Sequence, residues 1–416
     1  MRLRFLEALQ SLRTDLFISW RNVRRHGRRS LAGALAVTVG TIALILAAGF
    51  IEWIYAAMRD GAIYSGHGHL QIVRSGYRER GMADPFTYLL PEDSPARKHI
   101  EEAANVVRLA PRLKFAGLVS FGDSSLSFLG EGLDPQLELA GQYATIIEQG
   151  EPLTNDKPVG VLLGRGLANN LGAKVGDTVV LLVHKRGGAL DGIEVRVRGL
   201  FSTPTKAYDD VAIHVPFHIA NEVLQARGAH TWVVYLNETR HTSAVARTLR
   251  QQLSKDFELI PWYDAADFYN KTVRLFSRQV LVMKLIIALV VIFSISNAMM
   301  MNVMERTNEI ATAMALGLRR MRVLSRFLLE GVFIGLAGGL AGVALGYFIA
   351  SVISAVGIPM PPPPGMARAF VGEILVTADL GSDALLLAGV TALVASVYPA
   401  WKASRMVIAE ALRQGS

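Results

Sequence analysis

A short charged segment between two apolar runs carries the residues best suited to polar contact with another molecule. The sequence MNVMERTNEIATAMALGLRRMRVL runs from Met301 to Leu324. Glu305 and Glu309 are four residues apart, so they would share one face of a helix, with Arg306 beside them. Carboxylates and a guanidinium at this spacing can form ion pairs and charge-assisted hydrogen bonds with a partner.

Apolar residues accompany these charges at helical spacing. Met304, Ile310, Met314 and Leu316 supply apolar contact, and Gly317, followed by arginines, is typical of a helix end. A solvated charged loop is the alternative, but such a loop would not need ordered apolar residues. We therefore expect a short amphipathic helix with a docking partner.

Catalytic motifs are absent from the sequence. It contains no GxxxxGK[ST] phosphate loop and no HExxH or GxSxG motif in a plausible context. His214 and His218 are four apart, but Pro216 between them spoils a helical metal pair. His67 and His69 could share one face of a strand, yet we expect the histidines to be surface or loop residues. With no cysteine, thiolate zinc sites and disulfides are excluded. We expect no catalytic residue, metal or cofactor in this chain.

The elements that position the charged segment are apolar runs long enough to cross a bilayer. Of the 416 residues, 51% are hydrophobic and only 19% are charged, against about 25% charged in soluble proteins. Leu31–Ile51 is uncharged and longer than the apolar part of a signal peptide, which is the alternative interpretation. Three more runs follow at Leu281–Val303, Phe327–Val356 and Ala384–Ala400.

The layout predicts an α-helical membrane protein with four transmembrane helices and a mixed α/β extracytoplasmic domain inserted between the first and second spans. The predicted regions are an N-terminal amphipathic helix (1–30), the first span (31–55), the extracytoplasmic domain (56–279), the second span (280–303), the charged segment (304–326), the third span (327–356), a loop (357–383), the fourth span (384–400) and a tail (401–416).

Basic residues indicate the orientation. Arginines precede the first span, Arg319, Arg320 and Arg322 follow the second, and Lys402 and Arg405 lie in the tail. By the positive-inside rule these three segments are cytoplasmic, so both termini lie inside and the large domain lies outside. The net charge of +8 therefore reflects topology, and we expect no nucleic-acid partner.

Two further patterns concern the membrane helices. Phe5, Leu9, Leu12, Leu16 and Trp20 form an apolar stripe beside arginines, as in a helix that lies in the membrane interface or packs on cytoplasmic segments. Glycines four residues apart on the third span allow close approach of neighbouring helices. Two such rows fit a span wedged between two neighbours: Gly331, Gly335 and Gly339, and Gly338, Gly342 and Gly346.

In the extracytoplasmic domain the segments HLQIV, SLSFL, DTVVLLV and EVRVRGLF are short β-strand candidates bounded by glycine, proline or aspartate. Ser94–Leu109 and Ser243–Leu253 have apolar residues at helical spacing. Lys284 is expected at the outer end of the second span, where its stem could reach the headgroups.

Several stretches resemble permeases of the FtsX/MacB/LolC–LolE type, which are ABC transporter subunits of the mechanotransmission class. Glu305–Ile310 (ERTNEI), followed by Ala315–Gly317 (ALG), resembles their coupling segment. VGVLLGRGLANNLGAKVGDTVVLL resembles part of their periplasmic domain, and YPAWKASRMVIAEALR resembles their tail. SGHGHLQIVRSGY and PMPPPPGM are similar to stretches of lipoprotein-releasing permeases. The chain departs from the pattern at Ile408, where proline is usual, and at Met314, where a basic residue is common.

The resemblance implies that the charged segment is a coupling helix in a groove of a cytoplasmic ABC ATPase, present in two copies that hold ATP and Mg²⁺. The implied coupling residues are Glu305, Arg306, Thr307, Glu309, Ile310, Met314, Leu316 and Gly317. Because no ATPase domain is fused, we expect the ATPase to be a separate chain. Thr41 and Asn297 are candidates for lining a cavity between this permease and a second copy or a related permease.

The resemblance further implies a location in the bacterial inner membrane, among membrane lipids, with a periplasmic carrier or adaptor as a further partner. Three functions stay open. The first is ATP-driven extraction or export of a lipoprotein or other hydrophobic substrate. The second is MacB-like efflux of small molecules or peptides through an adaptor. The third is FtsX-like signalling to a periplasmic hydrolase, which the large size of the domain disfavours.

Overall fold

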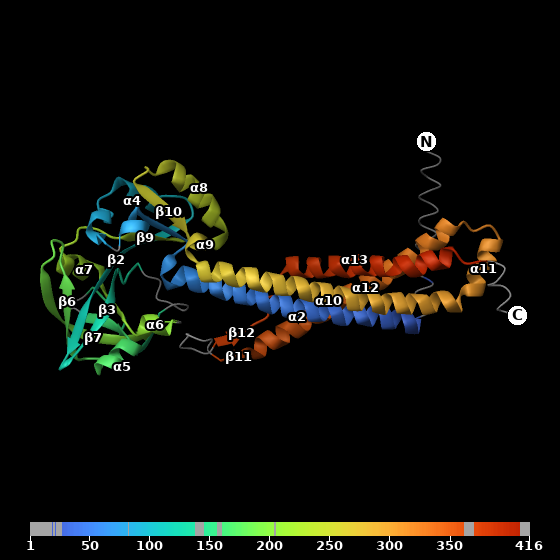
Figure 1. Ribbon diagram of the computed structural model, residues 1–416, viewed down its shortest axis with the longest axis horizontal. Coiled ribbons are helices and arrows are strands. Elements are labelled where there is room, and N and C mark those ends of the chain that lie inside the picture. Colours follow the sequence, from blue (N-terminus) through green and yellow to red (C-terminus); the bar gives the residue numbers. More distant parts are fainter. Residues whose placement is uncertain are drawn as a thin grey trace. The chain divides into compact units, whose positions relative to one another are not determined.

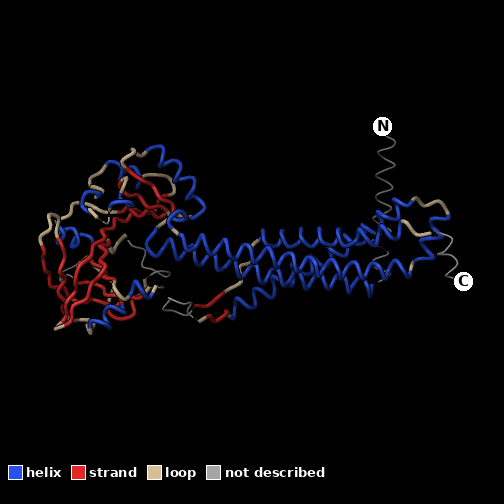
Figure 2. Tube along the Cα trace, in the orientation of Figure 1, coloured by secondary structure: helices blue, strands red, loops and turns tan. Residues whose placement is uncertain are grey.

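Long helices and a mixed β-sheet form two separate units of the chain (Figures 1 and 2). The computed structural model describes residues 19, 21, 27–81, 83–137, 145–155, 160–203, 205–361 and 370–407. The predicted apolar stripe from Phe5 to Trp20 and the tail position Ile408 lie outside the described residues. The helical unit comprises Met1–Tyr55, Val273–Pro359 and Val371–Ser416, and the sheet unit comprises Ala56–Thr272 and Met360–Phe370.

Four helices of the described chain are long and apolar enough to cross a membrane. They are α2 (Gly27–Ala62), α10 (Asp267–Glu305), α12 (Arg320–Val356) and α13 (Ala378–Ser404), and Figure 1 shows them side by side. Each contains one of the predicted apolar runs and continues beyond it. With 39 residues, α10 is about 58 Å long, roughly twice the thickness of the hydrocarbon core.

The two glycine rows of α12 face two different helices. A Cβ added at Gly335 would lie 2.3 Å from the Cβ of Ala392 on α13, and one added at Gly342 would lie 2.5 Å from the Cβ of Thr41 on α2. Only hydrogen atoms fit at these contacts, so the helix backbones approach closely. The row facing α13 is Gly331, Gly335 and Gly339, and the row facing α2 is Gly338, Gly342 and Gly346.

The segment between α12 and α13 is attached to α2. The Leu375 amide donates a hydrogen bond of 3.1 Å to the carbonyl oxygen of Gly49. A Cβ at position 49 would meet the Leu375 carbonyl oxygen at 2.7 Å, so glycine permits this crossing. Lys284 Nζ lies 3.9 Å from a carboxylate oxygen of Asp383, which places it level with the beginning of α13.

The sheet unit is built on one ten-stranded sheet, with the main order β10-β1-β9-β2-β3-β8-β5-β7-β4 and β6 paired with β2 and β7. The pairs β3–β8 and β5–β7 are parallel and the other pairs are antiparallel. The strands are β1 (Leu70–Arg74), β2 (Val106–Phe121), β3 (Ser124–Leu133), β4 (Ile146–Gly150), β5 (Gly160–Gly164), β6 (Thr178–His184), β7 (Leu190–Ser202), β8 (Ala212–Pro216), β9 (Thr231–Leu236) and β10 (Phe257–Pro261); β11 (Ile358–Met360) and β12 (Phe370–Gly372) form a separate pair.

Short helices cover parts of this sheet, and a core of mainly aliphatic residues with Phe128 and Trp232 lies between them. The helices are α3 (Tyr77–Arg80), α4 (Pro95–Glu101), α5 (Arg165–Leu171), α6 (Lys206–Asp209), α7 (Phe217–Leu224), α8 (Thr242–Gln252) and α9 (Trp262–Ala265), with a π-helical turn η1 (Ile63–His67) and 3₁₀ turns η2 (Pro85–Tyr88) and η3 (Thr239–His241).

The four predicted strand segments lie in β1, β3, β6 and β7, so that prediction is confirmed. The helix predicted for Ser94–Leu109 is wrong in its second half, because α4 ends at Glu101 and β2 begins at Val106. Asn105 has φ +69°, a left-handed conformation that ends a helical path. The β-branched pair Val106–Val107 then favours a strand.

Candidate functional site

A break at Arg306 separates α10 from the short helix α11 (Thr307–Ala315), which lies at one end of the four-helix bundle (Figure 1). Arg306 has φ −100° and ψ 13°, outside the helical range. The Thr307 hydroxyl donates to the carbonyl oxygen of Met304 at 2.8 Å. It thereby satisfies one of the carbonyls left without a partner where α10 ends.

The other end of α11 is closed by Gly317, which has φ +97°. The Leu318 amide donates to the Ala313 carbonyl at 3.0 Å, and the Gly317 amide donates to the Met314 carbonyl at 3.0 Å. These two bonds form a Schellman motif, whose left-handed position favours glycine. The α11 helix is therefore short and well delimited before α12 begins at Arg320.

The inner face of α11 belongs to the core of the helical unit. Ile310 and Met314 are 7% and 8% exposed and pack in a cluster that includes Val303 and Phe327. Both were predicted as packing contacts to an ATPase. Their side chains instead contact helices of their own chain, so in this structure they hold α11 in place.

The outer face of α11 is exposed and has mixed chemistry. Asn308, Glu309 and Thr312 on α11 are exposed, and so is Glu305, the last residue of α10 before the break. Leu316 is 85% exposed, which is unusual for a large apolar side chain at the end of a packed helix. Of the predicted coupling residues, Glu305, Glu309, Leu316 and Gly317 are thus exposed and can meet a partner, and Thr307 is half-buried.

Arg306 points into the helical unit, although it was predicted to contact a partner. Its Nη1 lies 3.1 Å from Oε1 of Glu330 on α12, and its Nε lies 3.4 Å from Oε2 of Glu309. The guanidinium carbon is 5.7 Å from the centre of the Phe327 ring, in the range of a cation–π contact. The side chain of Arg306 is 13% exposed and that of Glu330 is 3% exposed.

Two family models match the chain. Residues 30–252 match the MacB-like periplasmic core domain, and residues 281–408 match the FtsX-like permease C-terminal region. The first match alone covers more than half of the 416 residues. The chain belongs to the MacB/FtsX-type family of ABC transporter permeases. The sheet unit is therefore a MacB-like periplasmic-type domain, and the apolar helices make this permease a membrane protein.

Three relatives illustrate the similarity. The permease is 24% identical to the lipoprotein-releasing system transmembrane protein LolC of Neisseria meningitidis, over 92% of this chain and 93% of LolC. It is 25% identical to an uncharacterised ABC transporter permease of Methanocaldococcus jannaschii, over 64% of this chain and 65% of that protein. It is 32% identical to the macrolide export ATP-binding/permease protein MacB of Syntrophobacter fumaroxidans, over 44% of this chain but only 25% of MacB.

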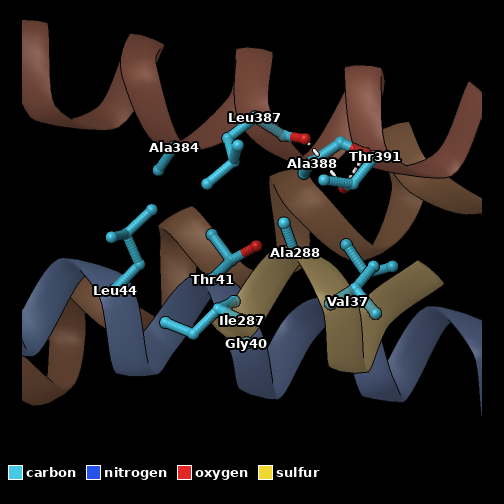
Figure 3. A pocket seen from close by; sticks show the side chains of 11 residues that line it. Val37, Gly40, Thr41, Leu44, Ile287, Ala288, Ala384, Leu387, Ala388 and Thr391 are labelled. Carbon is cyan, nitrogen blue, oxygen red and sulfur yellow. Dashed lines mark hydrogen bonds between the residues drawn. The ribbon is translucent and has the colours of Figure 1, made fainter. Parts of the chain in front are cut away.

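The two predicted cavity residues of the permease lie in different surroundings. Thr41 is 5% exposed and lines a small space among α2, α10 and α13, where Leu44, Ile287 and Ala388 surround it (Figure 3). This space measures about 10 Å³, the lower limit for one water molecule, so it holds no substrate. Asn297 is absent from its lining and is exposed on α10.

The sheet unit of the permease contains a buried polar cluster. Arg112 Nη1 on β2 lies 3.4 Å from Oε1 of Glu131 on β3, and Tyr208 donates to Oε2 of Glu131 at 3.3 Å. The Tyr208 hydroxyl also lies 3.1 Å from Nε2 of His214. Burial alone would raise the pKa of Glu131, but Arg112 and neighbouring cationic groups outweigh it and lower the pKa to about 2. Burial lowers the pKa of His214 to about 4.

The expectation that the histidines are surface or loop residues is wrong for His214, and three of the histidines are buried. His214 lies in β8 and is 5% exposed, whereas His69 and His230 lie in loops next to β1 and β9 and are 1% and 2% exposed. Their hydrogen-bond partners come from this chain, as where Nδ1 of His69 accepts from the Leu236 amide at 3.1 Å. His218, by contrast, is exposed. Among the described residues, no group of three or more histidine or carboxylate side chains could hold a metal ion.

Sequence reasoning missed the role of Glu330. A single carboxylate in a span whose other residues are apolar or small was the available signal, because such residues usually have a buried partner. Asn302 was missed as well: its Nδ2 donates to Oε2 of Glu330 at 3.4 Å. No hydrogen-bond donor for its buried Oδ1 lies among the described residues.

Proposed function

We propose that this permease is the membrane subunit through which a separate cytoplasmic ABC ATPase moves a domain on the far side of the membrane. Membership of the family implies an ATPase partner. Two ATPase copies, holding ATP and Mg²⁺, would bind α11 and the residues at its ends, through Glu305, Glu309 and Leu316. The observation that carries this proposal concerns the two faces of α11. Its outer face is exposed and carries charged and apolar residues, and its inner face packs in the core of the helical unit.

The cargo we propose is a lipoprotein or another hydrophobic substrate, extracted or exported from the inner membrane. The support is the match with LolC, which extends over nearly the full length of both chains. A MacB-like efflux function is the second candidate, supported by the higher identity of the shorter match with MacB. Copurification of a lipoprotein carrier would favour the first function, and copurification of an adaptor would favour the second.

We further propose that a second permease copy, or a related permease, covers α10. Only 11% of the apolar window of α10 is buried within the chain, against 33–39% for the other three candidate spans. Asn297 is exposed in the last quarter of this helix, beside exposed apolar residues such as Phe293 and Met301. An amide facing lipid is costly, whereas an amide at a helix–helix interface or cavity is satisfied.

Cysteine labelling would test the orientation. Since the chain contains no cysteine, single replacements at exposed positions report on one site each. Glu309→Cys on α11 should react with an impermeant maleimide only after the inner membrane is opened. Glu222→Cys on α7 should react in spheroplasts. The reverse pattern would refute the proposed orientation and, with it, docking of a cytoplasmic ATPase.

Charge reversal on α11 would test the docking itself. The double variant Glu305→Lys/Glu309→Lys should insert normally but copurify with at least tenfold less ATPase, since two exposed carboxylates become cations. A matched control, Glu194→Lys/Glu222→Lys, reverses two exposed carboxylates of the sheet unit and should keep the ATPase. Undiminished ATPase recovery and transport in the α11 variant would contradict the proposed coupling site.

A further inference from the structure

The ion pair between Arg306 and Glu330 lies where three helices meet. Arg306 occupies the break between α10 and α11, and Glu330 lies on α12. Asn302, on the last turn of α10, donates to the second carboxylate oxygen of Glu330. Glu330 is 2% exposed, so both its oxygens are engaged in the interior of the helical unit.

This pair differs in kind from the other contacts that hold α11. Ile310 and Met314 pack through apolar surface, which is non-directional and tolerates small shifts. The Arg306–Glu330 contact is charged, directional and shielded from water, so its energy changes steeply when the groups separate. A tilt of α11 about the break would separate the guanidinium from the carboxylate unless α12 moved as well.

The residue next to Glu330 continues the connection. At Gly331 an added Cβ would lie 1.6 Å from Oγ of Ser396 on α13 and 3.3 Å from Sδ of Met299 on α10. Glu330 thus precedes, in the sequence, a residue at which α12 approaches α13 closely. From there the two glycine rows connect α12 to both α13 and α2.

We propose that Glu330 is a positioning residue that ties the coupling helix α11 to α12, so that a movement imposed on α11 is passed to the whole helical unit. Arg306 is the other half of this tie and is not itself a docking residue. This inference rests on the proposed function, since it supposes that an ATPase moves α11. According to this proposal, the buried Arg306–Glu330 pair transmits the movement of α11 to α12.

The test uses the full-length permease with its copurifying ATPase in proteoliposomes. Glu330→Gln should retain ATPase binding and ATP hydrolysis, while transport per ATP hydrolysed falls at least tenfold. Glu373→Gln, which neutralises an exposed carboxylate in the segment before α13, is the matched control and should leave all three quantities unchanged. The charge-swapped double variant Arg306→Glu/Glu330→Arg should recover transport per ATP to within about threefold of wild type.

The outcomes separate the inference from the proposed function. If wild-type permease binds no ATPase, the proposed function fails. If the ATPase binds and Glu330→Gln transports as much per ATP as wild type, the tie is refuted. Should Glu330→Gln fail to insert, Arg306→Gln serves instead, because it removes the guanidinium that pairs with Glu330 and leaves the carboxylate in place. It should lower transport per ATP about threefold without lowering ATPase binding, and an unchanged ratio would refute the tie.

Discussion

A buried arginine–glutamate pair is found in each unit of this permease, but the two pairs hold very different elements. In the sheet unit, Arg112 and Glu131 lie on β2 and β3, which are also joined by a continuous backbone ladder from Arg112 to Phe121. In the helical unit, Arg306 and Glu330 join separate helices by side chains. The backbone hydrogen bonds of an α-helix are made within the helix, so they do not hold it to a neighbouring helix.

The difference teaches that the same chemical pair can be structural in one place and mechanical in another. Removing one partner of the sheet pair keeps the strand register but leaves an unpaired charge in the core, so stability should decrease. Removing it from the helical unit leaves the helices packed by glycine and alanine contacts, so coordination between helices should suffer. Three predictions test this contrast, and they run from the largest expected effect to the smallest.

Acidification should destabilise the sheet unit selectively. Burial lowers the pKa of His69, His214 and His230 to about 4, so the unfolded state binds more protons than the folded state between pH 6.5 and about 4. Stability is therefore full above pH 6.5 and is lost as the pH falls, by up to roughly 1.4 kcal/mol per pH unit for each histidine.

Hydrogen exchange of the full chain in nanodiscs at pH 7.5 and pH 5 would measure this effect. Amides of β1, β2 and β9 should exchange faster at the lower pH after correction for the intrinsic rate, while those of α12 should not. Every histidine among the described residues belongs to the sheet unit. An equal increase of the exchange rate in both units would contradict the predicted difference between them.

The variant Glu131→Gln should unfold the sheet unit more readily. It leaves the Arg112 guanidinium buried without its carboxylate, which typically costs about 3–5 kcal/mol. Limited proteolysis and hydrogen exchange of β2 and β3 would record the loss. Glu194→Gln on the exposed side of β7 removes an equivalent charge and should have no effect. If Glu131→Gln instead lowered transport per ATP hydrolysed without lowering the stability of the sheet unit, the Arg112–Glu131 pair would also take part in transmitting movement.

The variant Gly335→Ala should weaken the packing of α12 against α13. The new methyl group would lie 2.3 Å from the Cβ of Ala392, and overpacking of this kind costs about 1–3 kcal/mol. Gly389→Ala on α13 is the control, because nothing lies within 4 Å of its added Cβ. Thermal unfolding in detergent should separate the two variants, and equal midpoints would show that the glycine row is not a tight contact.

The sequence predicted the features that periodicity and charge encode locally. The apolar runs marked the four long helices, and alternation with glycine and proline breaks marked β1, β3, β6 and β7. The charged segment after the second run marked the surroundings of α11. These features depend on neighbours within one or two helical turns, which a single sequence displays directly.

Features that depend on distant partners could not be predicted. Arg306 and Glu330 are 24 residues apart on different helices, so no spacing rule connects them, and Arg306 was assigned to a partner. The burial of Ile310 and Met314 depends on where α11 folds back, which the sequence leaves open. The strand at Val106–Leu109 has apolar spacing compatible with a helix, and only pairing with β9 decides between the two.

The glycine-lined faces of α12 have one more consequence. At these positions α12 has no side chain to interlock with α2 or α13, although residues such as Ile45 and Leu385 pack against its backbone. We expect small rotations of α12 against these neighbours to require few changes of side-chain rotamer. In the permease, the same glycines would then provide both the close packing of α12 and its freedom to move against its neighbours.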